Sequence, residues 1–175
     1  MTDLLVYDHA EVSALFRELD SALDRGRPRE VFEKLDYLWA RLAVHIRAEH
    51  LHLFPALLAA SDGAKGGRVA GAPAPAEVRA VVRCLREDHD FFMRELAGAV
   101  NAARELAARD GPVDGGRLRE LRSVVLAVSA RLIEHNRVEE EQVYLWPEAL
   151  LSVEGRAALS AGLRREIENR PPRFA

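Results

Sequence analysis

The sequence predicts an all-α protein: an antiparallel up-down four-helix bundle with a short C-terminal helix. Apolar residues recur at alternating steps of three and four in four long segments, which is the period of an amphipathic helix. Ala, Leu, Arg and Glu dominate the composition, and 175 residues suffice for one domain with its own core. We assign residues 1–150 to the bundle and residues 151–175 to the short helix and a tail.

The first predicted helix ends at the breaker run of residues 25–28. The second is predicted as one long helix, followed by a Gly-, Ala- and Pro-rich crossover loop over residues 61–75. The apolar stripe of the first helix consists of Leu5, His9, Val12, Phe16, Leu19 and Leu23. The stripe of the second consists of Val31, Leu35, Leu38, Leu42, His45, Glu49, His52 and Ala56.

The third predicted helix ends at the breaker run of residues 110–112, and the fourth stops near Trp146. Residues 148–168 are predicted to add a short amphipathic helix, and the last eight residues a loose tail. The third stripe consists of Val78, Val82, Leu85, His89, Phe92, Leu96, Ala99, Ala103 and Leu106. The fourth consists of Leu118, Leu121, Val125, Val128, Leu132, His135, Glu139 and Gln142.

Charge and hydropathy argue against two classes of partner. The 25 basic and 28 acidic residues form no basic patch of the kind that follows phosphates, so we expect no nucleic acid. No segment has the roughly 18 uninterrupted apolar residues of a membrane span, and the first residues do not resemble a signal peptide. A cytoplasmic location is therefore the expectation.

Each of the four stripes contains a histidine, and helix lengths predict that these histidines lie at similar heights. His9 precedes Asp24 by 15 residues and His45 follows Pro28 by 17, so at about 1.5 Å per residue their heights differ by about 3 Å. His89 and His135 lie equally far from the second turn. Four imidazoles and two glutamates are thus predicted in one layer of the core.

The two hairpins also repeat one design. An Asp-His pair at residues 8–9 precedes His45-x-Arg47-x-Glu49, and a second pair at residues 88–89 precedes His135-x-Arg137-x-Glu139. Imidazole and carboxylate are ligands for iron, manganese and zinc, and the spacing of four residues lets His and Glu converge from one helix face. A buried carboxylate without a partner costs several kcal/mol, which a cation removes. The repeat therefore favours two metal ions bridged by carboxylates.

These motifs resemble the hemerythrin-like, or HHE cation-binding, family. The similarity rests on His9, on HIRAEHLHLFP from His45, on EDHDFF around His89 and on HNRVEEEQVYLWP from His135, and it covers residues 4 to about 150. It implies a four-helix bundle around a non-haem di-iron centre that reacts with O₂, NO or peroxide. By the same resemblance the metal ligands are His9, His45, Glu49, His89, His135 and Glu139, with the two glutamates as bridges.

One position departs from the oxygen-carrying members of that family. They have a further histidine four residues after the third-helix histidine, where this chain has Met93. The chain therefore resembles the members with four histidines and two carboxylates, and this departure puts reversible O₂ carriage in doubt. Zinc or manganese is the alternative to two iron ions. With either of these metals, the site could have a purely structural role in the bundle.

The remaining polar and aromatic residues receive weaker interpretations. We expect His52 in the core or behind the ligands, and His50 facing solvent or a neighbouring helix, with a spare ligand as its alternative. The side chains of Phe16, Phe92 and Met93 are expected to be core, with an apolar gas pocket as the alternative. Glu140 and Glu141 are predicted on a solvated face, and Tyr144 and Trp146 packed at the helix end.

Two function classes fit this site. The first is a protein that binds or senses O₂, NO or peroxide through a di-iron centre, in the response to iron, oxygen, or oxidative or nitrosative stress. The second is a di-iron enzyme that turns over peroxide or NO, or donates iron for the repair of iron-sulfur clusters. No dedicated acid, base or redox cysteine pair accompanies the predicted ligands, so the binding class is favoured. The sequence identifies no protein partner.

Overall fold

The computed structural model describes residues 2–63, 71–109 and 114–169, and these residues contain helices and no strand. The predicted all-α class is confirmed. The elements are α1 (Asp3–Asp24), α2 (Pro28–Ala48), the π-helix η1 (Glu49–Leu53), α3 (Phe54–Gly63), α4 (Pro75–Ala107), α5 (Gly115–Glu141), the 3₁₀ helix η2 (Val143–Leu145), α6 (Trp146–Leu150) and α7 (Val153–Glu168).

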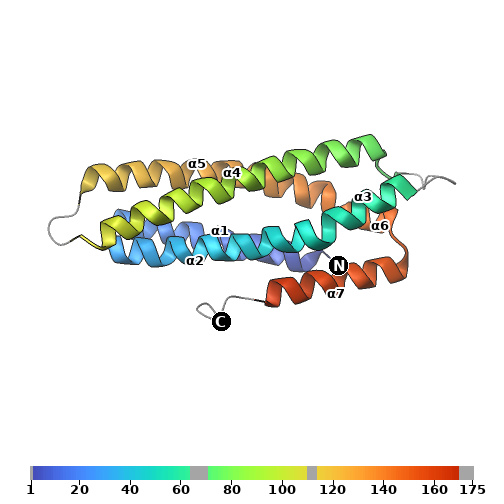
Figure 1. Ribbon diagram of the computed structural model, residues 1–175, viewed down its shortest axis with the longest axis horizontal. Coiled ribbons are helices and arrows are strands. Elements are labelled where there is room, and N and C mark those ends of the chain that lie inside the picture. The colour runs from blue at the N-terminus through green and yellow to red at the C-terminus, as the bar shows by residue number, and fades with distance from the viewer. Residues whose placement is uncertain (1, 64–70, 110–113, 170–175) are drawn as a thin grey trace.

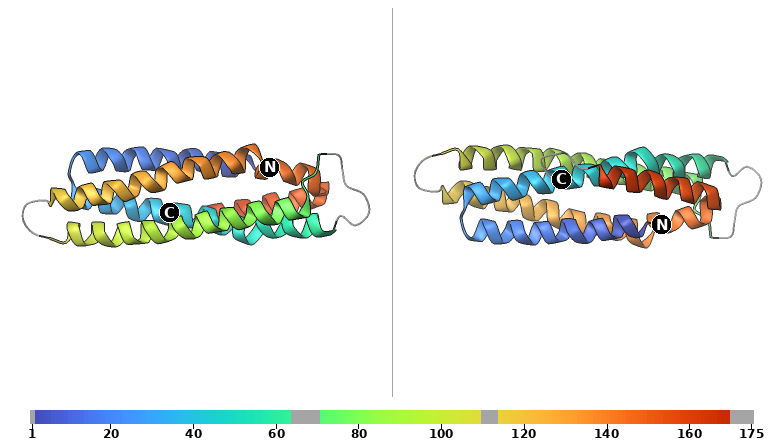
Figure 2. Two further views of the ribbon diagram at one scale, coloured as in Figure 1. Left: turned by 90° about the horizontal axis from the view of Figure 1, so that it is seen from above. Right: turned by 90° about the horizontal axis from the view of Figure 1, so that it is seen from below.

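The four longest helices lie along one common axis (Figures 1 and 2). Helix α1 packs against α2 and α5, and α4 packs against the same two helices. Successive long helices run in opposite directions, as the colour gradient in Figure 1 shows. None of the helices in the described ranges is long and apolar enough to cross a membrane.

The core consists of two apolar clusters with a polar layer between them. Along α1 the chain passes from Leu5 in one cluster through His9 to Val12 in the other. Along α4 it passes from Leu85 through His89 to Phe92 in the same way. Apolar side chains therefore close the layer of histidines at both ends, where water would otherwise compete for their nitrogen atoms.

The prediction of one uninterrupted second helix is wrong. The α-helix gives way to a π-helix at Glu49 and resumes at Phe54, whose amide donates to the carbonyl of Glu49. Pro55 is the physical reason, since proline has no amide hydrogen and its ring clashes with the carbonyl four residues earlier in an α-helix. One wide turn relieves this clash, and such π segments are frequent at functional sites.

The predicted end of the fourth helix is also wrong. Helix α5 ends at Glu141, because Gln142 leaves the helical region with φ −129° and ψ −65°. Val143–Leu145 then forms a 3₁₀ turn, and Pro147 stands in the first turn of α6. The described residues therefore contain more helical segments than the four bundle helices and one short C-terminal helix that the sequence predicts.

The C-terminal segment packs back on the bundle. Helix α7 starts at the N-cap Ser152, whose hydroxyl accepts a hydrogen bond from Gly155 N, and it lies against α2 and η1. The predicted short C-terminal helix thus corresponds to α6 and α7, while the proposed boundary at residue 150 stays a prediction. Residues 64–70 of the predicted crossover loop and 170–175 of the predicted tail lie outside the described residues.

Candidate metal centre

The structure brings all six predicted ligands together inside the bundle. His9 comes from α1, His45 from α2, Glu49 from η1, His89 from α4, and His135 and Glu139 from α5. Each is buried, and both glutamates are 0% exposed. The helical period used for the prediction explains this convergence, since each residue lies on the inward stripe of its helix.

In the first half of the cluster, two histidines face one another. The Nε2 atoms of His9 and His45 lie 3.2 Å apart, and Oε2 of Glu139 lies 3.2 Å from Nε2 of His9. Oε2 of Glu49 lies 3.6 Å from Nε2 of His45. These donor atoms therefore surround one point between α1, α2 and α5.

The second half repeats this geometry. The Nε2 atoms of His89 and His135 lie 3.0 Å apart, and Oε1 of Glu139 lies 3.1 Å from Nε2 of His135. Oε2 of Glu49 lies 3.3 Å from Nε2 of His89. Each glutamate consequently reaches histidines of both halves, which is the arrangement that a bridging carboxylate requires.

The donor atoms fall into two groups of a size that suits a cation. One group consists of His9, His45 and Glu139, the other of Glu49, His89, His135 and Glu139, and within each group the atoms lie within 4.8 Å of one another. Glu139 belongs to both groups. The cluster thus fits two neighbouring cations that share a carboxylate.

Acidic side chains orient two of the imidazoles. Nδ1 of His45 lies 3.0 Å from Oδ2 of Asp8, and Nδ1 of His135 lies 3.1 Å from Oδ2 of Asp88. Donation from Nδ1 to a carboxylate leaves the Nε2 lone pair directed into the cluster, as metal-binding histidines require. The Asp-His pairs of the sequence repeat supply both aspartates, whose role the sequence analysis did not identify.

The other two imidazoles also use their Nδ1 atoms outside the cluster. Nδ1 of His9 lies 2.7 Å from Oε1 of Glu140, and Nδ1 of His89 lies 2.9 Å from Nε2 of His50. Glu140 therefore does not simply belong to a solvated face as predicted. His50 contacts a neighbouring helix, one of the two environments expected for it, because the π-helical turn changes its direction.

Burial and neighbouring charge shift the pKa values strongly. Burial, reinforced by His9, lowers the pKa of His45 to about 3, and burial also lowers the pKa of His89 well below its ordinary value. For His135, burial acts in the same direction, but Glu139 and Asp88 outweigh it and raise the pKa. His45 and His89 are therefore neutral at pH 7, with lone pairs available to a metal.

The two buried carboxylates differ from each other. Burial and the charge of Glu139 raise the pKa of Glu49 well above its usual range. Burial works in the same sense on Glu139, but His135, His9 and His89 together hold its pKa well below the ordinary value. Two carboxylates this close resist simultaneous ionisation unless a cation compensates them.

Two carboxylate oxygens provide a test of the fit to a metal. Oε2 of Glu49 and Oε1 of Glu139 are fully buried and accept no hydrogen bond. A buried oxygen of this kind costs free energy unless it has a hydrogen-bond donor or a cation as its partner. These same two oxygens point at the facing histidines, so the residues fit a pair of cations bound by nitrogen and oxygen.

Tyr144 is a component of the cluster that the sequence analysis missed. Its hydroxyl lies 2.8 Å from Oε1 of Glu49 and 3.1 Å from Oε2 of Glu139. The prediction that it packs at the helix end is wrong, because the break at Gln142 turns η2 back over the cluster. Its position five residues after Glu139 in the repeat was the available signal.

The aromatic and sulfur residues predicted near the cluster have different surroundings. Phe92 is buried and stands edge-on to the His135 ring, with centroids 5.2 Å apart. Met93 packs against the apolar cluster that contains Phe92. His52 points to α7, where Nε2 lies 3.9 Å from Oε1 of Glu166.

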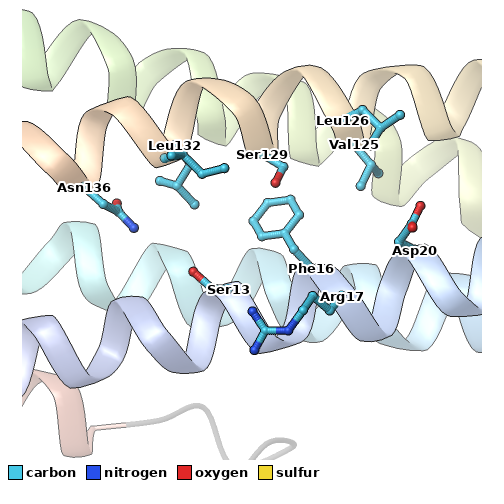
Figure 3. A pocket seen from close by; sticks show the side chains of 10 residues that line it. Ser13, Phe16, Arg17, Asp20, Val125, Leu126, Ser129, Leu132 and Asn136 are labelled. Atoms are coloured by element: carbon cyan, nitrogen blue, oxygen red, sulfur yellow. The ribbon is translucent and has the colours of Figure 1, made fainter.

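Phe16 lines a groove of about 360 Å³ between α1 and α5 (Figure 3). Ser13, Leu132 and Asn136 line the same groove. It contains none of the six predicted ligands, although Leu132 and Asn136 flank His135 in the sequence. The groove is thus a surface feature beside the cluster.

Comparison with known proteins agrees with this geometry. The model of the hemerythrin HHE cation-binding domain matches residues 1–147, which is most of the chain. No curated protein and no solved structure matches the sequence.

Proposed function

This chain belongs to the hemerythrin HHE cation-binding family, and on that premise we propose that it is a non-haem di-iron protein that binds O₂, NO or peroxide. The observation that carries the proposal is Glu139, whose two oxygens face histidines of different halves at 3.2 and 3.1 Å. A carboxylate in this position joins two cations into one centre.

The donor set favours a pair of ions such as iron over one structural zinc ion. It combines four imidazoles with two carboxylates and contains no thiolate, whereas structural zinc sites take four ligands and frequently use cysteine. Six inward side chains exceed the needs of one tetrahedral ion. Bound iron would supply an exchangeable coordination position and electrons for a small oxidising ligand.

The chain's own residues keep such a centre dry and ordered. Asp8 and Asp88 hold His45 and His135 by their Nδ1 atoms, and the two apolar clusters close the layer above and below. A ligand that is small and uncharged can enter this environment more easily than a large polar substrate. We therefore assign the protein to binding or sensing in the response to iron, oxygen or nitrosative and oxidative stress.

The test begins with ferrous iron and the purified protein under argon. We expect about two iron ions per chain, roughly 3.5 to 4 Å apart by X-ray absorption. His135→Ala should lower the metal content, whereas His52→Ala should leave it unchanged because that side chain contacts α7. One tightly held zinc per chain, or full iron content in His135→Ala, would contradict the di-iron proposal.

A second measurement separates binding from catalysis. The ferrous protein is mixed with O₂, NO or peroxide, and its visible spectrum and the ligand concentration are followed together. A binding protein gives a stoichiometric spectral change that reverses when the ligand is removed. Sustained consumption of peroxide or NO would assign the centre to an enzyme instead.

A further inference from the structure

The Tyr144 hydroxyl has three polar neighbours inside the cluster, and two of them are carboxylates. The side chain is buried, and its oxygen lies 2.8 Å from Oε1 of Glu49, 3.1 Å from Oε2 of Glu139 and 3.1 Å from Nε2 of His9. A phenol has one hydrogen to donate, and its oxygen can also accept a hydrogen bond, for example from His9. When Glu49 and Glu139 are both ionised they can only accept, so the phenol hydrogen serves one of them and the other oxygen-oxygen contact is left to be explained.

The spacing of these atoms is that of ligands around one cation. Ligand atoms about 2.1 Å from a metal and at right angles to each other lie about 3 Å apart. Nε2 of His9 lies 3.2 Å from Nε2 of His45 and 3.2 Å from Oε2 of Glu139. The Tyr144 oxygen is 3.1 Å from two of these atoms, so it stands where a further ligand of the same cation would stand.

The sequence repeat shows that this hydroxyl is specific to one half. Tyr144 follows Glu139 by five residues, and Phe54 follows Glu49 by five. The two rings occupy matching places: Tyr144 stacks on His9 with centroids 5.6 Å apart, and Phe54 stacks on His89 at 5.8 Å. Only the position beside His9 thus offers an oxygen to the cluster.

We propose that Tyr144 is a ligand of the cation held by His9, His45 and Glu139, and that it binds ferric iron as a phenolate. This inference rests on the proposed di-iron function. The phenol releases its proton to solvent as the oxygen-metal bond forms, and no electron is transferred in that step. Phe54 provides no such donor, so the second cation, held by His89 and His135, would have no phenolate ligand and could take a small ligand instead.

The experiment uses the visible spectrum of the ferric protein. Iron-loaded protein is oxidised with ferricyanide, and a phenolate-to-iron charge-transfer band is sought, with resonance Raman excitation inside that band. We expect phenolate ring vibrations in the wild type and complete loss of the band in Tyr144→Phe, with the band intensity measured per bound iron ion. Tyr7→Phe is the matched control, since Tyr7 is 63% exposed and should keep the full band.

The outcomes separate the two proposals. Two bound iron ions without a charge-transfer band, or a band that survives in Tyr144→Phe, would overturn the phenolate assignment and leave the di-iron proposal intact. Failure of the wild type to bind two iron ions would overturn both. If Tyr144→Phe does not fold, wild-type protein grown on ring-deuterated tyrosine decides the question, because the enhanced vibrations must shift on deuteration when a tyrosine is the ligand.

Discussion

The two halves of the metal cluster share one plan but differ in burial. In each half an aspartate contacts Nδ1 of a histidine and forms an ion pair with an arginine four residues before that histidine. In the first half the Asp8 and Arg41 side chains are 0% and 5% exposed. In the second half the Asp88 and Arg131 side chains are 22% and 45% exposed.

This difference separates the geometry of the metal site from the stability of the fold around it. The spacing of His and Glu, which is the same in both halves, decides where donor atoms converge. The surroundings of the supporting ion pair decide how much free energy that pair contributes to the fold, because water screens an exposed pair and not a buried one. We therefore expect equivalent substitutions in the two halves to agree in their effect on metal binding and to disagree in their effect on stability.

The largest expected effect comes from the residue that both halves share. Each oxygen of Glu139 faces one half of the cluster, and Glu139→Gln replaces one of these oxygens by an amide nitrogen. The substitution also removes the negative charge that lies between the two groups of donor atoms. We expect iron content to fall from about two per chain to less than one. His45→Ala removes a donor from the first half alone and should leave about one. Metal analysis after gel filtration measures both.

The control for this pair is Glu141→Gln. Glu141 lies two residues further along the same helix, and its carboxylate is 2.9 Å from Arg137 on the surface. The Glu141→Gln variant should retain about two iron ions per chain. Equal iron contents for Glu139→Gln and His45→Ala would contradict the idea that Glu139 serves both halves.

The second prediction compares the two aspartates. Asp8→Ala removes one member of a buried ion pair and should lower the free energy of unfolding of the metal-free protein by about 3 to 5 kcal/mol. Asp88→Ala should cost about 1 kcal/mol or less, because Arg131 is half exposed and regains water. Urea unfolding followed by circular dichroism measures both values.

Metal affinity sharpens the same comparison. Each aspartate holds one inward histidine, so each substitution should weaken iron binding by about 10- to 100-fold. A large stability difference with similar affinities would support the separation of the two properties. If Asp88→Ala destabilised the protein as much as Asp8→Ala, burial would not be the deciding variable.

The third prediction concerns α7, which packs on the first half. A Cβ at Gly162 would lie 2.6 Å from Nδ1 of His52, so α7 or the imidazole must move in Gly162→Ala. We expect a loss of about 1 to 3 kcal/mol in the free energy of unfolding, as for other overpacked contacts. Gly155→Ala in the same helix meets nothing closer than 3.5 Å and should stabilise by about 0.5 kcal/mol. Equal effects in urea unfolding would show that α7 does not pack tightly on η1.

The sequence was sufficient for the parts of the site that depend on regular helical geometry. His9, His45, His89 and His135 lie on inward stripes, and counting residues from each turn placed them at one level. Glu49 and Glu139 followed from their spacing of four residues after a histidine. These inferences need only a constant period and rise, which α-helices provide until the backbone departs from them.

The roles of Asp8 and Asp88 were missed within regular helices, whereas Tyr144 and the contact between His50 and His89 lie where the backbone departs from that geometry. His50 reaches His89 from within the π-helix, and Tyr144 reaches the cluster after the break at Gln142. The constant period of an α-helix describes the backbone at neither of these two places. Pro55 was a signal for the first irregularity, but the conformation of Gln142 depends on tertiary packing that no local pattern reports.

The smallest expected effect concerns the N-terminus of α5, which differs from that of α2 in its cap. The N-cap of α2 is Arg27, with no side-chain hydrogen bond, whereas Asp114 at the start of α5 accepts hydrogen bonds from Gly116 N at 3.0 Å and Arg117 N at 3.2 Å. The Arg117 amide, followed by that of Gly116, lowers the pKa of Asp114 in the folded state.

A lowered folded-state pKa means that Asp114 stabilises the fold above its unfolded pKa of about 3.9 and loses this contribution as the pH falls through the folded value. Asp114→Asn keeps an acceptor oxygen but does not titrate, so the stability difference between wild type and variant should be constant from about pH 7 to pH 5 and shrink below about pH 4. Because the buried cluster titrates identically in both proteins, it cancels from that difference, and a difference that grew on acidification would contradict the role of the carboxylate as the cap of α5.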